Sequence, residues 1–196
     1  MFLLGLTGSI GMGKSTTAKL FAEAGCAVWD ADAAVHRLYS KGGAAVPRFL
    51  ETFPEAVVDG AVSRPRLKEI ILRDPDALKT IESIVHPLVG LDRATFLKAA
   101  DAEILVLDIP LLFETGGEGK VNAVACVIVD DETQKQRVME RGTMTVAQFD
   151  AIRAKQMPAA EKAARSDYVI ETDTIEHARA QVQAVIEDIK GKQCHA

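Results

Sequence analysis

The sequence predicts an α/β protein with a doubly wound parallel sheet of five strands, and two observations predict it. Apolar runs without polar alternation, which suit strands covered on both faces, lie at residues 2–6, 27–29, 104–109, 121–129 and 168–170. Helix-like segments separate most of these runs, at residues 14–24, 131–140 and 175–189. Strand and helix therefore alternate, as they do in sheets that carry helices on both faces.

The first apolar run leads into a glycine-rich segment. Residues 8–15 read Gly-Ser-Ile-Gly-Met-Gly-Lys-Ser and fit the P-loop pattern G-x-x-x-x-G-K-[ST] between a strand and a helix. Glycines allow successive backbone N–H groups to turn inward around an anion, and the helix that begins near Gly13 adds the positive end of its dipole. We expect Lys14 to reach the β- and γ-phosphates of a nucleotide and the Ser15 hydroxyl to ligate Mg²⁺. The expected fold is therefore of the P-loop NTPase type.

Two carboxylates follow the second apolar run. Asp30 and Asp32 come directly after residues 27–29, at the carboxyl end of a predicted strand, which is the edge where ligands bind in open α/β sheets. Phosphoryl transfer needs a group that positions the acceptor hydroxyl, and Asp32 is the candidate base. The alternative is that an aspartate caps the helix predicted over residues 33–39. We expect both roles to be present, divided between Asp30 and Asp32.

Residues 33–102 interrupt the alternation. Helical patterns lie at residues 65–72, 76–85 and 87–100, and no convincing strand accompanies them. This is too much chain for one crossover, so we interpret it as a helical insertion. His86 precedes the last of these helices. A lone histidine more often caps or packs, and a role facing a ligand is left open.

The third apolar run ends at Asp108. A strand that closes on an acid has the form of a Walker B site, in which the carboxylate orients Mg²⁺ or its water. Many strands end in aspartate before a turn, so this pattern is weak by itself.

The helix predicted over residues 131–140 brings two arginines to one side. Arg137 and Arg141 are four residues apart, so both guanidinium groups can reach phosphate oxygens. Surface pairing with acids such as Glu140 is the equal alternative. The basic segment that follows, residues 141–165, suits a mobile lid over phosphates, whereas a pair of solvated surface helices is the alternative that composition alone slightly favours.

Bulk properties argue against several classes of protein. The 196 residues carry a formal net charge of −5, which disfavours a nucleic-acid surface. The three cysteines form no C-x-x-C pair, so a disulfide framework or zinc site is disfavoured and a cytoplasmic location is expected. We find neither a signal-peptide pattern nor an apolar run of membrane-spanning length. The length suits one domain, with a core of about residues 1–32, 103–140 and 166–196, the insertion at 33–102 and the lid at 141–165.

Taken together, six blocks of sequence resemble the dephospho-CoA kinase family over nearly the whole chain. The blocks are residues 5–15, 30–32, 84–88, 108–114, 134–141, and 156–157 with Lys162. Their order and spacing are far more specific than a P-loop alone. The resemblance implies transfer of the γ-phosphoryl group of ATP, with Mg²⁺, to the ribose 3′-hydroxyl of dephospho-CoA, the last step of coenzyme A synthesis.

The resemblance also implies roles for individual residues. Asp32 matches the catalytic base of the family, and Arg137 and Arg141 match its phosphate-binding arginines on the lid side, which act with Lys14. Residues 33–102 look like its CoA-binding domain. The residues expected on the acceptor side are Thr7, Asp32, Arg64 and His86. The residues expected to contact ATP are Gly8, Gly11, Met12, Gly13, Lys14, Ser15 and Thr16, and those expected to hold Mg²⁺ are Ser15 and Asp108.

The chain departs from the family pattern in three places. Ser9 replaces a usual glycine and Met12 a usual small residue, neither at a position that the P-loop motif fixes. Glu171-Thr172 stands where an Asp-Asn pair is common near the last strand, so we assign no residue to the adenine.

Other functions compete with this interpretation. Another small P-loop kinase, acting on a nucleoside monophosphate or a sugar-like alcohol, is the nearest alternative, and the length of the insertion and the His86-Pro87 block argue against it. A GTPase is disfavoured because no [NT]-K-x-D motif is present. A nucleotide-gated binding protein without turnover is the alternative outside the enzymes, and the base candidate and arginine pair argue against it. We expect ATP and dephospho-CoA as partners of a monomer or weak homo-oligomer.

Overall fold

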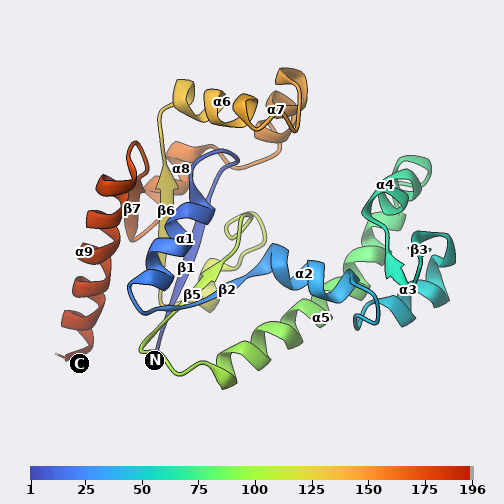
Figure 1. Cartoon of the computed structure of the whole chain (residues 1–196), viewed down its shortest axis with the longest axis horizontal. Coiled ribbons are helices and arrows are strands. Elements are labelled where there is room, and N and C mark those ends of the chain that lie inside the picture. Colours follow the sequence, from blue (N-terminus) through green and yellow to red (C-terminus); the bar gives the residue numbers. More distant parts are fainter. Residues whose placement is uncertain (195–196) are drawn as a thin grey trace. The chain divides into compact units, whose positions relative to one another are not determined.

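The computed structural model describes residues 1–194, and the chain divides into two compact units (Figure 1). The core unit comprises Met1–Trp29 together with the chain from Ala100 onward, and the inserted unit comprises Asp30–Ala99. The inserted unit overlaps most of the insertion expected at residues 33–102. Each unit has its own hydrophobic core.

A parallel five-stranded sheet forms the centre of the core unit, as the sequence predicted. Its strands, in the order in which they lie in the sheet, are β2 (Ala27–Asp30), β5 (Ile104–Asp108), β1 (Phe2–Gly8), β6 (Ala123–Ile128) and β7 (Tyr168–Glu171). The central strand β1 pairs in parallel with β5 on one side and with β6 on the other. All five residues of β5 are buried, which explains why its sequence is apolar without alternation.

Helices cover this sheet and also lie beyond the carboxyl ends of its strands. They are α1 (Lys14–Glu23), α6 (Asp131–Glu140), α7 (Val146–Arg153), α8 (Ala159–Ala164) and α9 (Ile175–Cys194). A short 3₁₀ helix, η2, spans Glu118–Lys120. Phe21 of α1 and Ile189 of α9 are completely buried in one cluster with Leu6 of β1. Figure 1 shows α6 and α7 beyond the carboxyl end of β6.

The inserted unit is mainly helical. It contains α2 (Ala31–Tyr39), α3 (Val46–Thr52), α4 (Arg64–Arg73) and α5 (Ala77–Ala99), with a 3₁₀ helix, η1, at Pro54–Ala56. Phe49 is completely buried at the centre of its core, edge-to-face with Tyr39 at a centroid distance of 5.6 Å. Aromatic packing therefore contributes to the core of the inserted unit.

The prediction of two helices around His86-Pro87 was wrong. A single helix, α5, runs from Ala77 to Ala99 with Pro87 inside it. Proline removes one hydrogen bond to the preceding turn and crowds its carbonyl, which ordinarily ends or kinks a helix. Here an apolar stripe continues across the proline, because Ile81, Val85 and Leu88 all pack in the same cluster. Tertiary packing on both sides of Pro87 outweighs the local cost.

The expectation that the insertion contains no strand was also wrong. Two short strands, β3 (Val57–Val58) and β4 (Ala61–Val62), pair antiparallel. The two residues between them, Asp59 and Gly60, have φ values of 51° and 79°. Positive φ at both positions is the type I′ hairpin turn, and Asp-Gly is one of its preferred sequences. The Val-Val-Asp-Gly-Ala-Val segment carried this signal.

Within residues 1–194, no helix has both the length and the apolarity required to cross a bilayer.

Candidate functional site

The P-loop joins β1 to α1 within the core unit. β1 ends at Gly8 and α1 begins at Lys14. Between them Gly11 and Gly13 adopt left-handed φ values of 79° and 83°. A Cβ on Gly13 would lie 2.9 Å from the Thr172 hydroxyl oxygen, so a side chain there is opposed by both backbone conformation and space. The loop therefore takes the shape that its glycines permit.

Among the residues that the structure describes, no side chain caps the amino end of α1. Its N-cap residue is Gly13, and its first turn contains no acidic residue. The helices α2, α4, α6 and α7 instead begin after a side chain that accepts a hydrogen bond from a first-turn amide; these side chains are Asp30, Ser63, Asp130 and Thr145. The positive end of α1 is thus available to an anion, which its unpaired first-turn amides attract.

Lys14 is held next to an acid of the neighbouring strand. Its ammonium forms an ion pair with Asp108, the last residue of β5, and the Asp108 side chain is buried. Parallel pairing places Asp108 opposite Leu6 of β1, two residues before the P-loop motif begins. A phosphate at the P-loop would compete with this carboxylate for the lysine. The acid expected from the Walker B pattern thus lies in contact with the lysine expected from the P-loop pattern.

The hydroxyl of Thr7 is engaged inside the fold. The side chain is buried, and its Oγ1 donates a hydrogen bond of 3.1 Å to the carbonyl oxygen of Pro110. Pro110 lies just after β5, so this bond ties β1 to the turn that follows its neighbouring strand. A direct contact of this hydroxyl with an acceptor stays a prediction.

A cavity of about 240 Å³ lies beside the amino end of α1. The residues that line it come from the P-loop, α1, α6 and its C-cap, the turn after β7 and the start of α9; they are Gly13, Thr16, Thr17, Arg137, Arg141, Thr172, Asp173, Thr174, Ile175 and Ala178. The structure therefore brings both predicted arginines to one cavity, next to the helix end that favours an anion.

Arg137 is oriented by the turn after β7. It donates hydrogen bonds to the hydroxyl and the carbonyl oxygen of Thr172, at 3.1 and 2.6 Å, and to the carbonyl oxygen of Asp173 at 3.2 Å. Glu140, the alternative partner, accepts a hydrogen bond of 2.8 Å from Gln136 instead. Surface pairing with Glu140 therefore does not account for Arg137.

Sequence reasoning missed Thr172 as a member of this site. Its buried hydroxyl lies 2.9 Å from the carbonyl oxygen of Met12 and accepts from Arg137, so it joins the P-loop to α6. In the sequence, Thr172 was noted only because Glu171-Thr172, near the last strand, departs from the family pattern. A hydroxyl in the sequence does not reveal partners 160 and 35 residues away.

A second group is the ion pair between Glu114 and Lys162, two residues that the sequence analysis included only in the blocks that resemble the family. Lys162 of α8 is completely buried, and its ammonium lies 2.9 Å from a carboxylate oxygen of Glu114 and 3.2 Å from the Pro110 carbonyl oxygen. The Met157 amide also donates to Glu114, at 2.9 Å. Burial alone raises the pKa of Glu114, but the hydrogen bonds from Lys162 and Met157 outweigh it and hold this pKa below its ordinary value.

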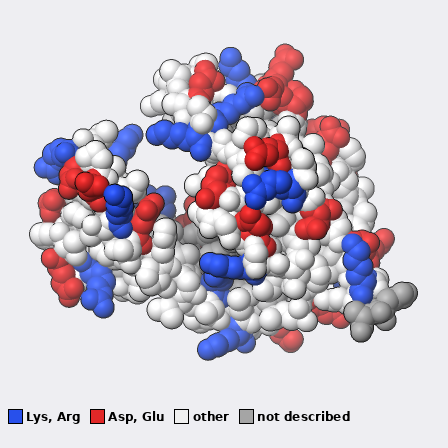
Figure 2. All heavy atoms as spheres, turned by 180° about the vertical axis from the view of Figure 1, so that it is seen from behind, with Lys and Arg blue, Asp and Glu red and all other residues white. Residues whose placement is uncertain are grey.

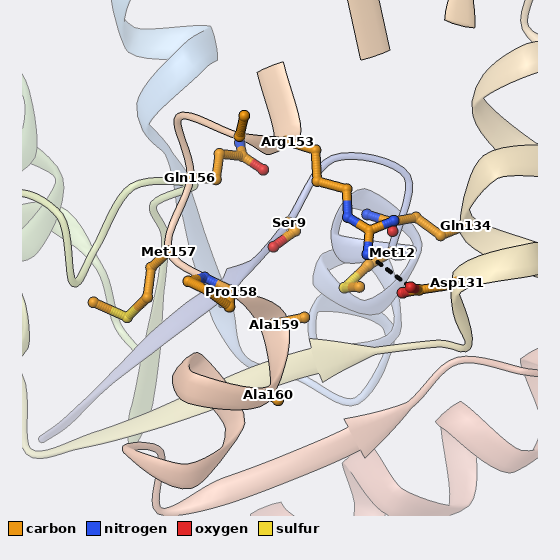
Figure 3. Close-up of a pocket in the computed structure, with 11 residues that line it drawn as sticks. Ser9, Met12, Asp131, Gln134, Arg153, Gln156, Met157, Pro158, Ala159 and Ala160 are labelled. Carbon is orange, nitrogen blue, oxygen red and sulfur yellow. Dashed lines mark hydrogen bonds and ion pairs between the residues drawn. The ribbon is translucent and has the colours of Figure 1, made fainter. Parts of the chain in front are cut away.

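Much of the basic charge in residues 141–165 is used within the protein. Arg153 pairs with Asp131 at 2.7 Å, and Arg165 pairs with Glu118 at 2.7 Å. Arg153 reaches across a cavity of about 530 Å³ that also adjoins Ser9 and Met12 of the P-loop (Figure 3). The segment contains the two helices α7 and α8, which the alternative of surface helices expected and which a lid also permits. Its movement over phosphates stays a prediction.

In the inserted unit, Asp30 at the end of β2 and Asp32 just after it have different roles in the fold. Asp30 caps α2 by accepting a hydrogen bond of 2.9 Å from the Ala33 amide. Asp32 is exposed in the first turn of the same helix. Capping by Asp30 leaves Asp32 available for chemistry.

The two remaining predicted residues lie on the surface of the inserted unit. Arg64 is the first residue of α4, and its guanidinium carbon lies 5.9 Å from the centroid of the Tyr39 ring. His86 is exposed on α5, directly before Pro87. Both side chains are accessible to a ligand.

Known proteins match this chain over almost its full length. The family model of dephospho-CoA kinase matches residues 2–177. A dephospho-CoA kinase from Ruegeria pomeroyi is 68% identical over 195 residues, which cover 100% of this chain and 99% of that protein. One from Cereibacter sphaeroides is 55% identical, covering 96% of each chain.

Solved structures agree with these sequence matches. A crystal structure of a Thermus thermophilus protein has a TM-score of 0.85 at 34% identity, covering 95% of this chain and 97% of that one. A dephospho-CoA kinase from Campylobacter jejuni has a TM-score of 0.68 at 25% identity, covering 97% and 98%. A shikimate kinase from Acinetobacter baumannii, with a TM-score of 0.53 at 16% identity over 98% and 94% of the two chains, shares the fold.

Proposed function

Because this chain belongs to the dephospho-CoA kinase family, we propose that it transfers the γ-phosphoryl group of ATP to the ribose 3′-hydroxyl of dephospho-CoA. The products are coenzyme A and ADP, and the reaction completes coenzyme A synthesis. The observation that carries this proposal is the family match over residues 2–177, which spans the P-loop and the whole inserted unit. The uncapped amino end of α1 supports it independently, since it provides a site for the phosphates.

We assign the phosphates of ATP to the P-loop. The backbone around Gly8, Gly11, Met12 and Gly13 and the first turn of α1, with Ser15 and Thr16, would surround them. Lys14 would exchange its contact with Asp108 for the β- and γ-phosphates, where its charge stabilises the oxygens that gain charge in the transition state.

We assign the adenosine part of ATP to the 240 Å³ cavity beside α1. The sequence predicts that Arg137 binds phosphate, and we propose that it also offers the flat face of its guanidinium group to the base, since its contacts with Thr172 and Asp173 fix that plane. Arg141 lies one helical turn further along, where it can reach phosphate oxygens. This assignment supplies the adenine contacts that the sequence left open.

We propose that Asp32 accepts the proton of the acceptor hydroxyl. The carboxylate is exposed in the first turn of α2, where it is accessible to an acceptor hydroxyl. On the acceptor side we further propose Arg64 and His86, which are exposed on the inserted unit, together with Thr7. Arg64 offers a cation for the phosphates of dephospho-CoA.

The donors present fit a magnesium ion held largely by the substrate. Within residues 1–194 no group of three or more acidic, histidine or cysteine side chains could hold a metal by itself. Mg²⁺ in nucleotide sites usually keeps several waters and takes one or two protein oxygens beside the phosphates, and Ser15 and Asp108 offer these. When bound, the ion would neutralise charge on the β- and γ-phosphate oxygens.

We also propose that the enzyme acts in the cytoplasm as a monomer or weak homo-oligomer and not on nucleic acid. Cys26 and Cys126 are both buried free thiols, as expected in a reducing compartment. On the face drawn in Figure 2, basic and acidic side chains are interspersed, which offers no continuous basic surface there for nucleic acid.

An assay of ADP release tests the proposed reaction. Purified protein is given MgATP with dephospho-CoA, adenosine monophosphate or shikimate as the acceptor. We expect turnover with dephospho-CoA alone. Turnover confined to another acceptor would keep a P-loop kinase and contradict the substrate, and ATP binding without turnover would contradict the enzyme.

The variant Asp32→Asn tests the base. We expect kcat to fall by about 10²–10⁴, the usual contribution of a positioned general base, while the affinity for MgATP stays unchanged. Asp101→Asn is the matched control, since Asp101 is an exposed aspartate of the core unit. Equal kcat values for both variants would remove Asp32 from the mechanism.

A further inference from the structure

Two glutamines hold one residue of the P-loop by both of its backbone groups. The Ile10 amide donates to Oε1 of Gln156 at 3.1 Å, and the Ile10 carbonyl oxygen accepts from Nε2 of Gln134 at 2.7 Å. Ile10 lies directly before Gly11, in the middle of the motif. We propose that Gln134 and Gln156 are positioning residues, which fix the P-loop in the conformation that receives phosphate.

The two glutamines reach Ile10 from different elements. Gln134 belongs to α6, and Gln156 lies in the segment between α7 and α8. Figure 3 shows the two side chains on opposite sides of the 530 Å³ cavity that adjoins the loop. The P-loop is thus held from two directions by parts of the chain more than 120 residues further along.

The burial of Gln134 supports a positioning role. The side chain is 1% exposed, and its Oε1 has no hydrogen-bond partner within the described part of the chain. A buried amide with an unsatisfied oxygen costs free energy that an apolar residue of similar size would avoid. Its Nε2, in contrast, makes a short bond to the P-loop. Stability alone therefore does not explain a glutamine at this position.

The position of Gln156 is fixed by its neighbour. The Met157 amide donates to Glu114, and Glu114 is paired with the completely buried Lys162. This ion pair therefore anchors the peptide that carries Gln156, and it limits the freedom of the Gln156 side chain at Ile10.

α6 also contacts the loop directly after Ile10. A Cβ built on Gly11 would lie 2.5 Å from Val138 and 3.0 Å from the carbonyl oxygen of Gln134. The two glutamines, which we call the glutamine clamp, thus hold Ile10 at a point where Gly11 already fits closely against α6. A loop held in this way loses less conformational entropy when phosphate binds, which strengthens binding.

Alanine variants measure the contribution of the clamp. For Gln156→Ala and Gln134→Ala we expect the Kd for MgADP, measured by calorimetry, to rise roughly threefold to tenfold, the usual effect of losing one hydrogen bond. The KM for dephospho-CoA should stay within about twofold of the unmodified protein. Gln136→Ala is the matched control, because Gln136 lies on α6 but bonds to Glu140. Kd values equal to that of Gln136→Ala would overturn the proposal.

Glutamate variants separate positioning from packing. Gln156→Glu still presents an oxygen to the Ile10 amide, whereas the ionised carboxylate of Gln134→Glu cannot donate to the Ile10 carbonyl group. We expect the amide of Ile10 to stay protected from hydrogen exchange in Gln156→Glu and to lose protection in Gln156→Ala. We expect Gln134→Glu to weaken MgADP binding at least as much as Gln134→Ala. Rescue by both glutamates, or by neither, would contradict the clamp.

The inference rests on the proposed use of ATP, but the two can fail separately. The Kd for MgADP needs no acceptor, so it reports on the clamp even if dephospho-CoA is not the substrate. Gln156 is only partly buried, so its variants remain informative if Gln134→Ala does not fold.

Discussion

At the scale of single residues, two glycines with positive φ values allow the effect of backbone strain to be distinguished from an effect on the candidate site. Gly13 and Gly25 have similar φ values of 83° and 90°. A Cβ on Gly13 would press against Thr172, whereas a Cβ on Gly25 would meet nothing within 4 Å. The two positions therefore share a conformational requirement and differ in what surrounds them.

We predict that Gly25→Ala costs about 1–2 kcal/mol of unfolding free energy, the strain of a left-handed alanine, with no change in nucleotide binding. Gly13→Ala carries the same strain and also displaces Thr172, the partner of Arg137. For this variant we expect a larger loss of stability and a rise of about tenfold in the Kd for MgATP, as when one charge-assisted hydrogen bond is lost. Guanidinium unfolding and calorimetry provide the two measurements. Equal nucleotide affinities would show that Thr172 does not orient the site.

At the scale of elements, the ion pair between Glu114 and Lys162 joins the turn after β5 to α8. The Glu114 side chain is 19% exposed and Lys162 is completely buried, so removing Lys162 leaves a partly desolvated carboxylate and removing Glu114 leaves a buried ammonium. We predict that Lys162→Met lowers the free energy of unfolding by about 3 kcal/mol, near the lower limit for a broken buried pair. The double variant Glu114→Gln, Lys162→Met should regain much of this loss, since it contains no buried charge and the amide oxygen introduced by Glu114→Gln can still accept from the Met157 amide.

The sole tryptophan, Trp29, is 3% exposed and provides the fluorescence signal for these unfolding curves. A double variant as unstable as Lys162→Met would contradict the argument from an unpaired charge.

The same pair predicts a dependence of stability on pH. The folded-state pKa of Glu114 lies below its ordinary value of 4.5, so the unfolded chain binds this proton first. The contribution of Glu114 is therefore fully present above pH 4.5 and is lost as the pH falls through the lower, folded-state pKa. We expect the unmodified protein to lose more stability than Glu114→Gln over this acidic range. Parallel unfolding curves at several pH values give the difference, and identical slopes would contradict it.

At the scale of the whole molecule, the sequence predicted most of what depends on local pattern. Unalternated apolar runs indicated the buried parallel strands, and the spacing of the P-loop indicated the end of β1 and the start of α1. The sequence did not predict the continuity of α5, because Pro87 opposes a helix locally and only the packing of residues such as Ile81 and Leu88 overrides it. The Asp59-Gly60 hairpin was a readable signal that we missed.

The candidate site was predictable where one motif holds several functional groups together. The contacts of Thr172 with Met12 and Arg137, and of Lys162 with Glu114, join segments that only the sheet order brings close. A single sequence does not show which partners the Thr172 hydroxyl or the Lys162 ammonium will have. Contacts that depend on tertiary structure therefore could not be predicted from the sequence.

The division into two compact units predicts two separate cooperative openings. Phe21 and Phe49 are both completely buried, one in the core of each unit. Phe21→Leu and Phe49→Leu are mild large-to-small changes in a core, and each should cost about 1 kcal/mol. If the units open separately, Phe49→Leu should speed hydrogen exchange of protected amides in residues 30–99 by about fivefold and leave the core unit unchanged. Phe21→Leu should do the reverse.

Exchange measured by mass spectrometry on peptides of both units distinguishes separate opening from a single global opening, in which either variant would accelerate exchange in both units equally. Separate opening would leave the P-loop and its glutamine clamp intact while the inserted unit, with Asp32, Arg64 and His86, unfolds and refolds.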